Sequence, residues 1–140
     1  MKYGWLILAA VGILLLAGGT AMGGTNAAAR IADAIAYAEG FYVSDSRPQR
    51  NNNPGDLTRA LGYPSLGMDG IYVIFQTVQD GWNALRKQVQ MMLDNTSTVY
   101  NSSMTIYEVA QRYTVTDQLA WATNVAQRLG VNTNTKISEV

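Results

Sequence analysis

The pattern of apolar and polar residues separates an N-terminal apolar segment from an amphipathic remainder. Residues 5–17 are all apolar or small, and the run continues weakly through residues 18–22. The segment is apolar on every side of a helix, which favours entry into a membrane over burial in a soluble domain. We therefore expect an N-terminal apolar helix, followed by a glycine-rich linker, within residues 1–24.

The length of this segment leaves two outcomes open. A run of this size matches the apolar core of a signal peptide, and the small residues Ala21 and Gly23 permit cleavage after Gly23. Counted from Tyr3 to Met22, the segment also approaches the roughly 20 residues that span a bilayer, with Lys2 on the cytoplasmic side. Either outcome carries the chain beyond Arg30 across a membrane, so the protein is expected in the periplasm or anchored facing it.

The remainder of the chain is predicted to be predominantly helical. Alanine-rich residues 27–39 favour a helix, with Asn26 as N-cap and Gly40 directly after the last helical residue. Apolar residues recur at helical spacing in three later stretches, each with its own start signal. The first two begin with the capping boxes Thr77/Asp80 and Thr105/Glu108, and the third follows Thr116, with Leu119, Ala122, Ala126 and Leu129 facing inward and Gly130 ending it.

One β element interrupts these helices. Four turn-forming residues punctuate the chain between Leu57 and Thr77, and residues 71–75 are β-branched or aromatic. This pattern predicts a small hairpin that forms one wall of a cleft. The fold class is therefore α+β, predominantly α, with a domain at 25–132 and a flexible tail at 133–140.

Composition narrows the chemistry. The 140 residues hold ten basic and ten acidic side chains, scattered singly, so the net charge is zero and nucleic-acid binding is not expected. The chain contains neither Cys nor His, which removes disulfides, the usual zinc ligands and Cys or His nucleophiles. We expect no metal and no cofactor, so any hydrolytic chemistry must use carboxylates, hydroxyls or amides.

Glu39 is the strongest catalytic candidate. It falls in the final turn of the predicted helix, where the helix dipole disfavours a negative charge. The neighbouring Tyr37, Phe41 and Tyr42 offer apolar cover, which disfavours the ionised carboxylate further. Both effects raise the pKa of Glu39, as a proton-donating glutamate requires.

A rigid turn follows this glutamate. Pro54 and Gly55 define a tight turn, and the preceding Asn51, Asn52 and Asn53 carry donors and acceptors that match sugar hydroxyl and N-acetyl groups. The same amides can instead close the loop on itself. The sequence leaves both roles open for each asparagine.

These features together resemble the lysozyme-like lytic transglycosylases of phage virions and some bacterial envelopes, over roughly residues 30–131. The resemblance rests on Ala36-Tyr37-Ala38-Glu39-Gly40-Phe41, on Asn52-Asn53-Pro54-Gly55, and on the pattern Phe-x-Thr-x-x-x-Gly-x-x-Ala-Leu formed by Phe75, Thr77, Gly81, Ala84 and Leu85. Residues 105–113 and 121–131 resemble the last two helices of that family. The resemblance implies a lysozyme-like domain that cleaves the MurNAc–GlcNAc β-1,4 bond of peptidoglycan glycan strands, and it matches Tyr113 to a tyrosine whose hydroxyl lies near the catalytic carboxylate.

The product of such a reaction stays open. In lytic transglycosylases one glutamate donates a proton to the leaving oxygen and then removes one from the C6 hydroxyl of the same sugar, which gives a 1,6-anhydro end. A hydrolytic muramidase commonly uses a second carboxylate, for which Asp45 and Asp56 are available. Asp56 also departs from the family pattern, which usually has Asn before the leucine.

The remaining candidates have a structural alternative. Tyr63 and Tyr72 in the predicted hairpin are candidates for stacking on sugars, whereas Trp82 and Trp121 fall on apolar helical faces typical of a core. Glu108 is better explained by its capping box than by catalysis. Three arginines, Arg47, Arg50 and Arg59, either engage the acidic peptide stems of peptidoglycan or keep the loop soluble, and we favour solubility for two of them.

Two other functions compete with an enzyme. The scaffold can serve as a non-catalytic glycan-binding or structural protein of a virion or envelope. A small membrane-anchored regulator of a secretion apparatus is a third possibility, with support only from the N-terminal segment. A Glu39 side chain buried away from a cleft, or paired with Arg50 and turned away from it, would favour the structural role.

Overall fold

The computed structural model describes residues 23–140. The predictions for the signal or anchor segment fall on residues 1–22 and lie outside this range. Within residues 23–140, none of the helices is long and apolar enough to cross a membrane.

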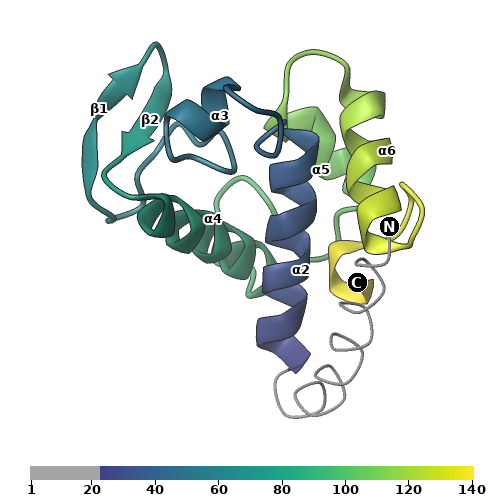
Figure 1. The fold of residues 1–140 in the computed structure, drawn as a ribbon. Coiled ribbons are helices and arrows are strands. Elements are labelled where there is room, and N and C mark those ends of the chain that lie inside the picture. The colour runs from purple at the N-terminus through teal and green to yellow at the C-terminus, as the bar shows by residue number, and fades with distance from the viewer. Residues whose placement is uncertain (1–22) are drawn as a thin grey trace, which may run out of the picture.

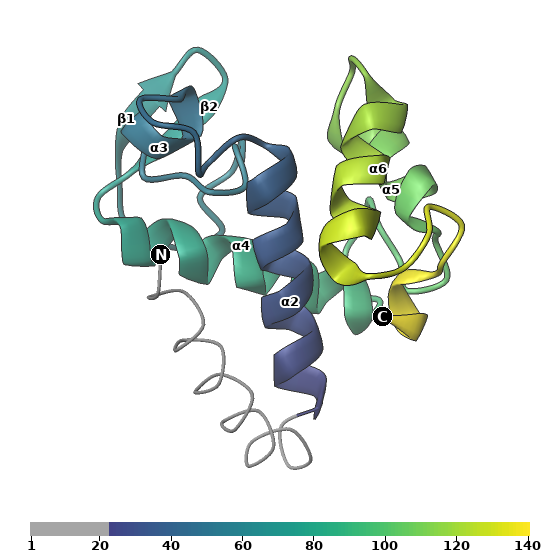
Figure 2. The same ribbon diagram turned by 45° about the vertical axis from the view of Figure 1, so that its right-hand side comes forward.

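The described chain is a mostly helical α+β domain with one antiparallel hairpin, as predicted (Figure 1). The long helix α2 crosses α4, with α3 and the hairpin in the half on one side of α2 and α5 and α6 in the half on the other side (Figure 2). It packs against both α4 and α6. The elements in chain order are α2 (Gly23–Ala38), α3 (Arg47–Arg50), β1 (Ser65–Asp69), β2 (Tyr72–Phe75), α4 (Val78–Leu93), α5 (Ile106–Tyr113), α6 (Gln118–Leu129) and the 3-10 turn η1 (Ile137–Glu139).

The central helix α2 begins earlier than the sequence predicts and ends at Ala38, one residue before the predicted end. It starts at Gly23, so Asn26 lies inside the helix instead of capping it. At the other end, Gly40 has a φ of +82°, a conformation that glycine adopts without strain. The amide of Gly40 bonds to the carbonyl of Tyr37, and the amide of Phe41 bonds to that of Ala36, as in a Schellman motif. Glu39 is thereby held as the last residue before the chain turns away.

The hairpin presents one buried side. In β2, Val73 and Phe75 are buried and alternate with half-buried Tyr72 and Ile74, whereas β1 is exposed throughout. Its register pairs Asp69 with Tyr72 and Ser65 with Phe75, with an irregularity between Ser65 and Gly67. Hydrogen bonds from the amides of Val73 and Phe75 to the carbonyls of Leu57 and Asn51 fasten β2 to the loop before it. The asparagine turn and the hairpin therefore form one unit.

Helix α4 approaches this unit closely at Gly81. A Cβ atom on Gly81 would lie 1.9 Å from the backbone oxygen of Asn52 and 2.8 Å from the Cδ of Pro54. Only glycine allows the helix to pack at this distance. The predicted Thr77/Asp80 capping box is present and begins the helix. The buried side of α4 includes Ala84, Leu85, Val89 and Met92.

The two later helices follow the sequence prediction with two corrections. The Thr105/Glu108 capping box begins α5, and Gly130 ends α6 with a φ of +74°. The N-cap of α6 is Asp117, one residue after Thr116. Leu119 was expected to face inward but is 63% exposed, because the buried side of α6 is formed by Trp121, Ala122, Val125, Ala126 and Leu129.

The C-terminal residues 133–140, predicted to be a flexible tail, pack against α5. The amide of Ile106 bonds to the carbonyl of Thr135, and the amide of Ile137 bonds to that of Met104. Ile137 is 2% exposed and belongs to the hydrophobic core. The tail is thus part of the domain, because it covers the N-terminal end of α5 and buries an apolar side chain there.

Candidate active site

The carboxylate of Glu39, at the end of α2, accepts a hydrogen bond from a tryptophan of α6. The indole Nε1–H of Trp121 donates a hydrogen bond to Oε1 of Glu39 at 2.8 Å. Trp121 is 6% exposed, so this donor is removed from water and Glu39 is its partner. Since the indole only donates, Oε1 acts as the acceptor, and Oε2 is the oxygen free to carry a proton.

Glu39 opens into a cleft of about 310 Å³ between the two halves. One wall consists of Ile71 and Tyr72 from the hairpin with Arg47 and Asp56. The opposite wall is the segment that joins α5 to α6, with Val115, which is 94% exposed, at its rim. The remaining lining residues are Thr58, Tyr113, Thr114 and Thr116. A cleft of this volume can accept part of a sugar chain.

The pKa of Glu39 is raised to about 7. The main cause is burial, which disfavours the charged form, and the negative charge of Asp56 acts in the same direction. The hydrogen bond from Trp121 and the positive charge of Arg47 oppose this rise without cancelling it. A carboxyl group with this pKa is partly protonated near neutral pH, which is the state that a general acid needs.

Beside Glu39, Arg47 and Asp56 form an ion pair. Nε of Arg47 donates to Oδ1 of Asp56 at 3.2 Å, and the other guanidinium nitrogen, Nη2, bonds to Oδ2. The Asp56 side chain is only 5% exposed. The same guanidinium lies over the ring of Tyr72, 3.7 Å from its centroid. Arg47 thus joins α3 to the hairpin and fixes one wall of the cleft.

Tyr113 lines the same cleft as Glu39. Its hydroxyl donates to the carbonyl oxygen of Gly55 at 2.8 Å, and its ring stacks on Trp121 with centroids 4.9 Å apart. Burial raises the pKa of Tyr113 well above its usual value, so the hydroxyl stays neutral. The stack supports the indole that holds Glu39.

The three asparagines of the turn all make hydrogen bonds within the protein. Asn53 is fully buried: its Nδ2 donates to the carbonyls of Leu57 and Val73, and its Oδ1 accepts from the amide of Leu57. Asn52 donates to the carbonyl of Phe75, and Asn51 donates to Asp69. None of the three lines the Glu39 cleft. Their geometry supports the loop-closing role over contact with sugar.

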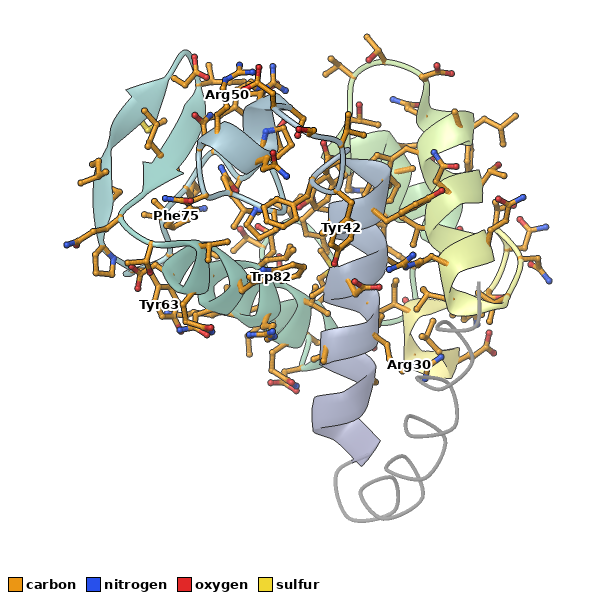
Figure 3. The ribbon with its side chains drawn as sticks, viewed as in Figure 1. Arg30, Tyr42, Arg50, Tyr63, Phe75 and Trp82 are labelled. Atoms are coloured by element: carbon orange, nitrogen blue, oxygen red, sulfur yellow. The ribbon has the colours of Figure 1, made fainter. Side chains whose placement is uncertain are left out.

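Three other predicted residues lie away from this cleft. Tyr63 is beside α4, with Lys87 Nζ 5.9 Å from its ring centroid (Figure 3). The side chain of Asp45 is 83% exposed and lies 3.9 Å from Arg50, which Figure 3 shows at the end of α3. Arg50 is therefore paired with Asp45 and not with Glu39. Of the sugar-stacking candidates, only Tyr72 lines the cleft.

Two residues of the site were missed at the level of sequence. The sequence places Trp121 in the core and leaves Arg47 open between binding peptide stems and keeping the loop soluble, because a helical apolar position and a lone loop arginine carry no sign of a partner. Trp121 contacts Glu39, which is 82 residues away in the chain. Arg47 contacts Asp56 and Tyr72, whose positions beside it are set by packing. The only available signal was that a buried indole N–H needs an acceptor.

Within residues 23–140, no group of three or more carboxylates comes together in a way that could hold a metal ion. No family model, curated protein or solved structure matches the chain significantly.

Proposed function

We propose that this chain is a peptidoglycan lytic transglycosylase with a lysozyme-like domain, in which Glu39 is the catalytic acid and base. The observation that carries the proposal is the position of Glu39: a half-buried carboxyl group with a pKa of about 7 that opens into a cleft. The sequence resemblance supplies the substrate, the MurNAc–GlcNAc β-1,4 bond.

The proposed reaction uses one carboxyl group in two steps. Protonated Glu39 donates its proton from Oε2 to the glycosidic oxygen, and the bond to the anomeric carbon breaks with its electrons leaving on that oxygen. The carboxylate then removes the proton of the C6 hydroxyl of the same muramic acid, whose oxygen bonds to the anomeric carbon. An attacking group on the same sugar has a high effective concentration, so no second carboxylate is needed.

The position of Asp56 supports one alternative reaction, hydrolysis by water. It lines the same cleft as Glu39, so a hydrolytic muramidase that uses Asp56 to handle water is the second candidate. Against this role, the ion pair with Arg47 already engages both oxygens of Asp56. We therefore favour intramolecular attack and 1,6-anhydro products.

The test is digestion of purified peptidoglycan with wild-type protein and with Glu39→Gln. The amide is nearly isosteric but cannot donate the proton, so we expect a loss of about a hundredfold to ten-thousandfold in rate. Mass analysis of the products distinguishes anhydro from reducing muramic ends. Reducing ends would move the protein to the muramidases, and wild-type rates in the Gln variant would refute the role of Glu39. A folded protein that binds glycan without cleaving it would favour the non-catalytic alternative.

We further propose that residues 1–22 deliver this domain to the periplasm, or to a virion that meets the cell wall. A C-terminal reporter fusion tests the side of the membrane. The mass of the mature chain tests cleavage.

A further inference from the structure

A second groove continues from the Glu39 cleft. It has a volume of about 350 Å³ and shares Thr58 with the cleft. One side is formed by Gln88 and Met91 of α4, and the other by the loop at residues 96–100. Tyr100 in this groove lies next to Tyr113 in the cleft, with ring centroids 6.1 Å apart. A polymer that passes Glu39 can therefore extend into the second groove.

The second groove is positively charged. Arg59 and Arg112 line it, and no Asp or Glu does. Neither arginine forms an ion pair among residues 23–140, whereas Arg47, Arg50 and Arg128 each pair with an aspartate. Arg112 is oriented by one bond, from its Nη1 to the carbonyl oxygen of Glu108 at 3.3 Å. Both side chains are exposed and keep donors free for a ligand.

This arrangement resolves a choice among the loop arginines that the sequence left open. Arg47 and Arg50 are engaged by Asp56 and Asp45. Arg59 is the loop arginine without a carboxylate partner in the described chain, and α5 places Arg112 on the same groove. The fold thus gathers two free guanidinium groups at one place beside the candidate active site.

We propose that Arg59 and Arg112 bind the carboxylates of the peptide stems that substitute the glycan strand. This inference rests on the proposed peptidoglycan substrate. The sugars of such a strand are neutral at neutral pH, and the peptides attached to muramic acid carry its carboxylate groups. A guanidinium group donates two parallel hydrogen bonds to a carboxylate, so an arginine pair beside the cleft selects strands that still carry their stems.

The test measures binding in the Glu39→Gln background, so that the substrate is not consumed. Full-length protein with Arg59→Gln and Arg112→Gln is compared with a control that carries Arg30→Gln and Arg86→Gln. The control removes two positive charges from exposed arginines that do not line the groove. Thermal unfolding verifies that every variant is folded. The ligands are intact peptidoglycan and the same material after an amidase has removed the stems and the lactyl carboxylates exposed by that hydrolysis have been capped as neutral methylamides.

We expect the Arg59/Arg112 variant to bind intact peptidoglycan about tenfold or more weakly, since two charge-assisted contacts are lost. The control should bind as tightly as its parent, and all variants should bind stem-free strands equally. An equal loss in the control, or a loss that persists on stem-free strands, would overturn the inference. The proposed cleavage is judged separately, by the products of wild-type protein. If the protein binds strands in a stem-dependent way but cleaves none, the proposed enzymatic activity is refuted and the proposed binding of the stems by Arg59 and Arg112 stands.

Discussion

Trp121 and Glu39 are 82 residues apart in the chain and share a hydrogen bond of 2.8 Å between Nε1 and Oε1. The bond joins the end of α2 to α6 across the candidate active site. It fixes which carboxyl oxygen accepts from the protein, so Oε2 remains the oxygen that can carry a proton. Burial around this pair raises the pKa of Glu39 to about 7, and that value leads directly to the first prediction.

The first prediction is that Glu39 destabilises the fold as the pH rises. Below pH 4.5 the carboxyl is protonated in both the folded and the unfolded chain. Between the ordinary glutamate pKa of 4.5 and the raised pKa of about 7, the unfolded chain ionises while the folded protein keeps its proton, so stability is lost over this window. At 1.36 kcal/mol per pKa unit, the loss approaches about 3 kcal/mol.

Glu39→Gln removes this ionisation. Its free energy of unfolding relative to wild type should therefore increase from pH 4 to pH 8 by up to that amount, measured by urea denaturation. A difference that does not change with pH would contradict the raised pKa. This measurement needs no substrate and is independent of the proposed reaction.

The second prediction concerns Trp121→Phe. Phenylalanine keeps much of the apolar volume but removes the N–H that lowers the pKa of Glu39. The pKa should rise further, so the alkaline limb of the pH–rate profile for cleavage should move to higher pH. The maximal rate should fall about tenfold, because one oriented hydrogen bond to the carboxyl group is lost.

Trp82→Phe is the matched control for this change. Trp82 packs edge-to-face on Phe41 with ring centroids 5.5 Å apart, and it does not line the Glu39 cleft. The same substitution there should leave the alkaline limb in place. Equal shifts in both variants would mean that Trp121 acts through general packing and not through its bond to Glu39.

The third prediction separates the two aspartates that were candidates for a second carboxylate. The negative charge of Asp56 raises the pKa of Glu39, so Asp56→Asn should lower that pKa and move the alkaline limb of the pH–rate profile to lower pH. Cleavage at acidic pH should persist. Asp45→Asn should change neither the pKa of Glu39 nor the pH–rate profile, because Asp45 is exposed and does not line the cleft.

A loss of activity at every pH in Asp56→Asn would instead indicate the hydrolytic mechanism. Product analysis of that variant decides the matter, since the proposed transglycosylase continues to form anhydro ends without Asp56. The stability of the variant should be measured alongside, because Arg47 loses its partner.

The fourth prediction is that Asn53 stabilises the fold. Asn53→Ala leaves the amide and carbonyl of Leu57 and the carbonyl of Val73 without their side-chain partner in a buried region. We expect a loss of about 2–4 kcal/mol in the free energy of unfolding. Asn83→Ala is the control, since Asn83 accepts one exposed bond from Gln79 and should cost less than about 1 kcal/mol. Equal costs would show that the turn does not depend on Asn53.

The sequence by itself determined the features that depend on neighbours along the chain. Both capping boxes join a residue to one three positions later, and both are present. The end of α2 at Gly40, beside Glu39, could be predicted because it depends only on the local backbone conformation that glycine allows. Helical periodicity likewise predicted α4, α5 and α6, and β-branched residues predicted β2. These interactions are short in range, so a single sequence can report them.

Tertiary structure decided the features that depend on contacts between distant segments. Leu119 is exposed and residues 133–140 are packed because the orientation of α6 and the cover over α5 are set by the whole core. Tyr63 and Tyr72 look equivalent in sequence, yet only Tyr72 reaches the cleft. Trp121 reaches Glu39, and Arg59 joins Arg112, only when α5 and α6 pack beside α2 and α4. No pattern along the chain encodes these distances, since they result from packing side chains from every element at once.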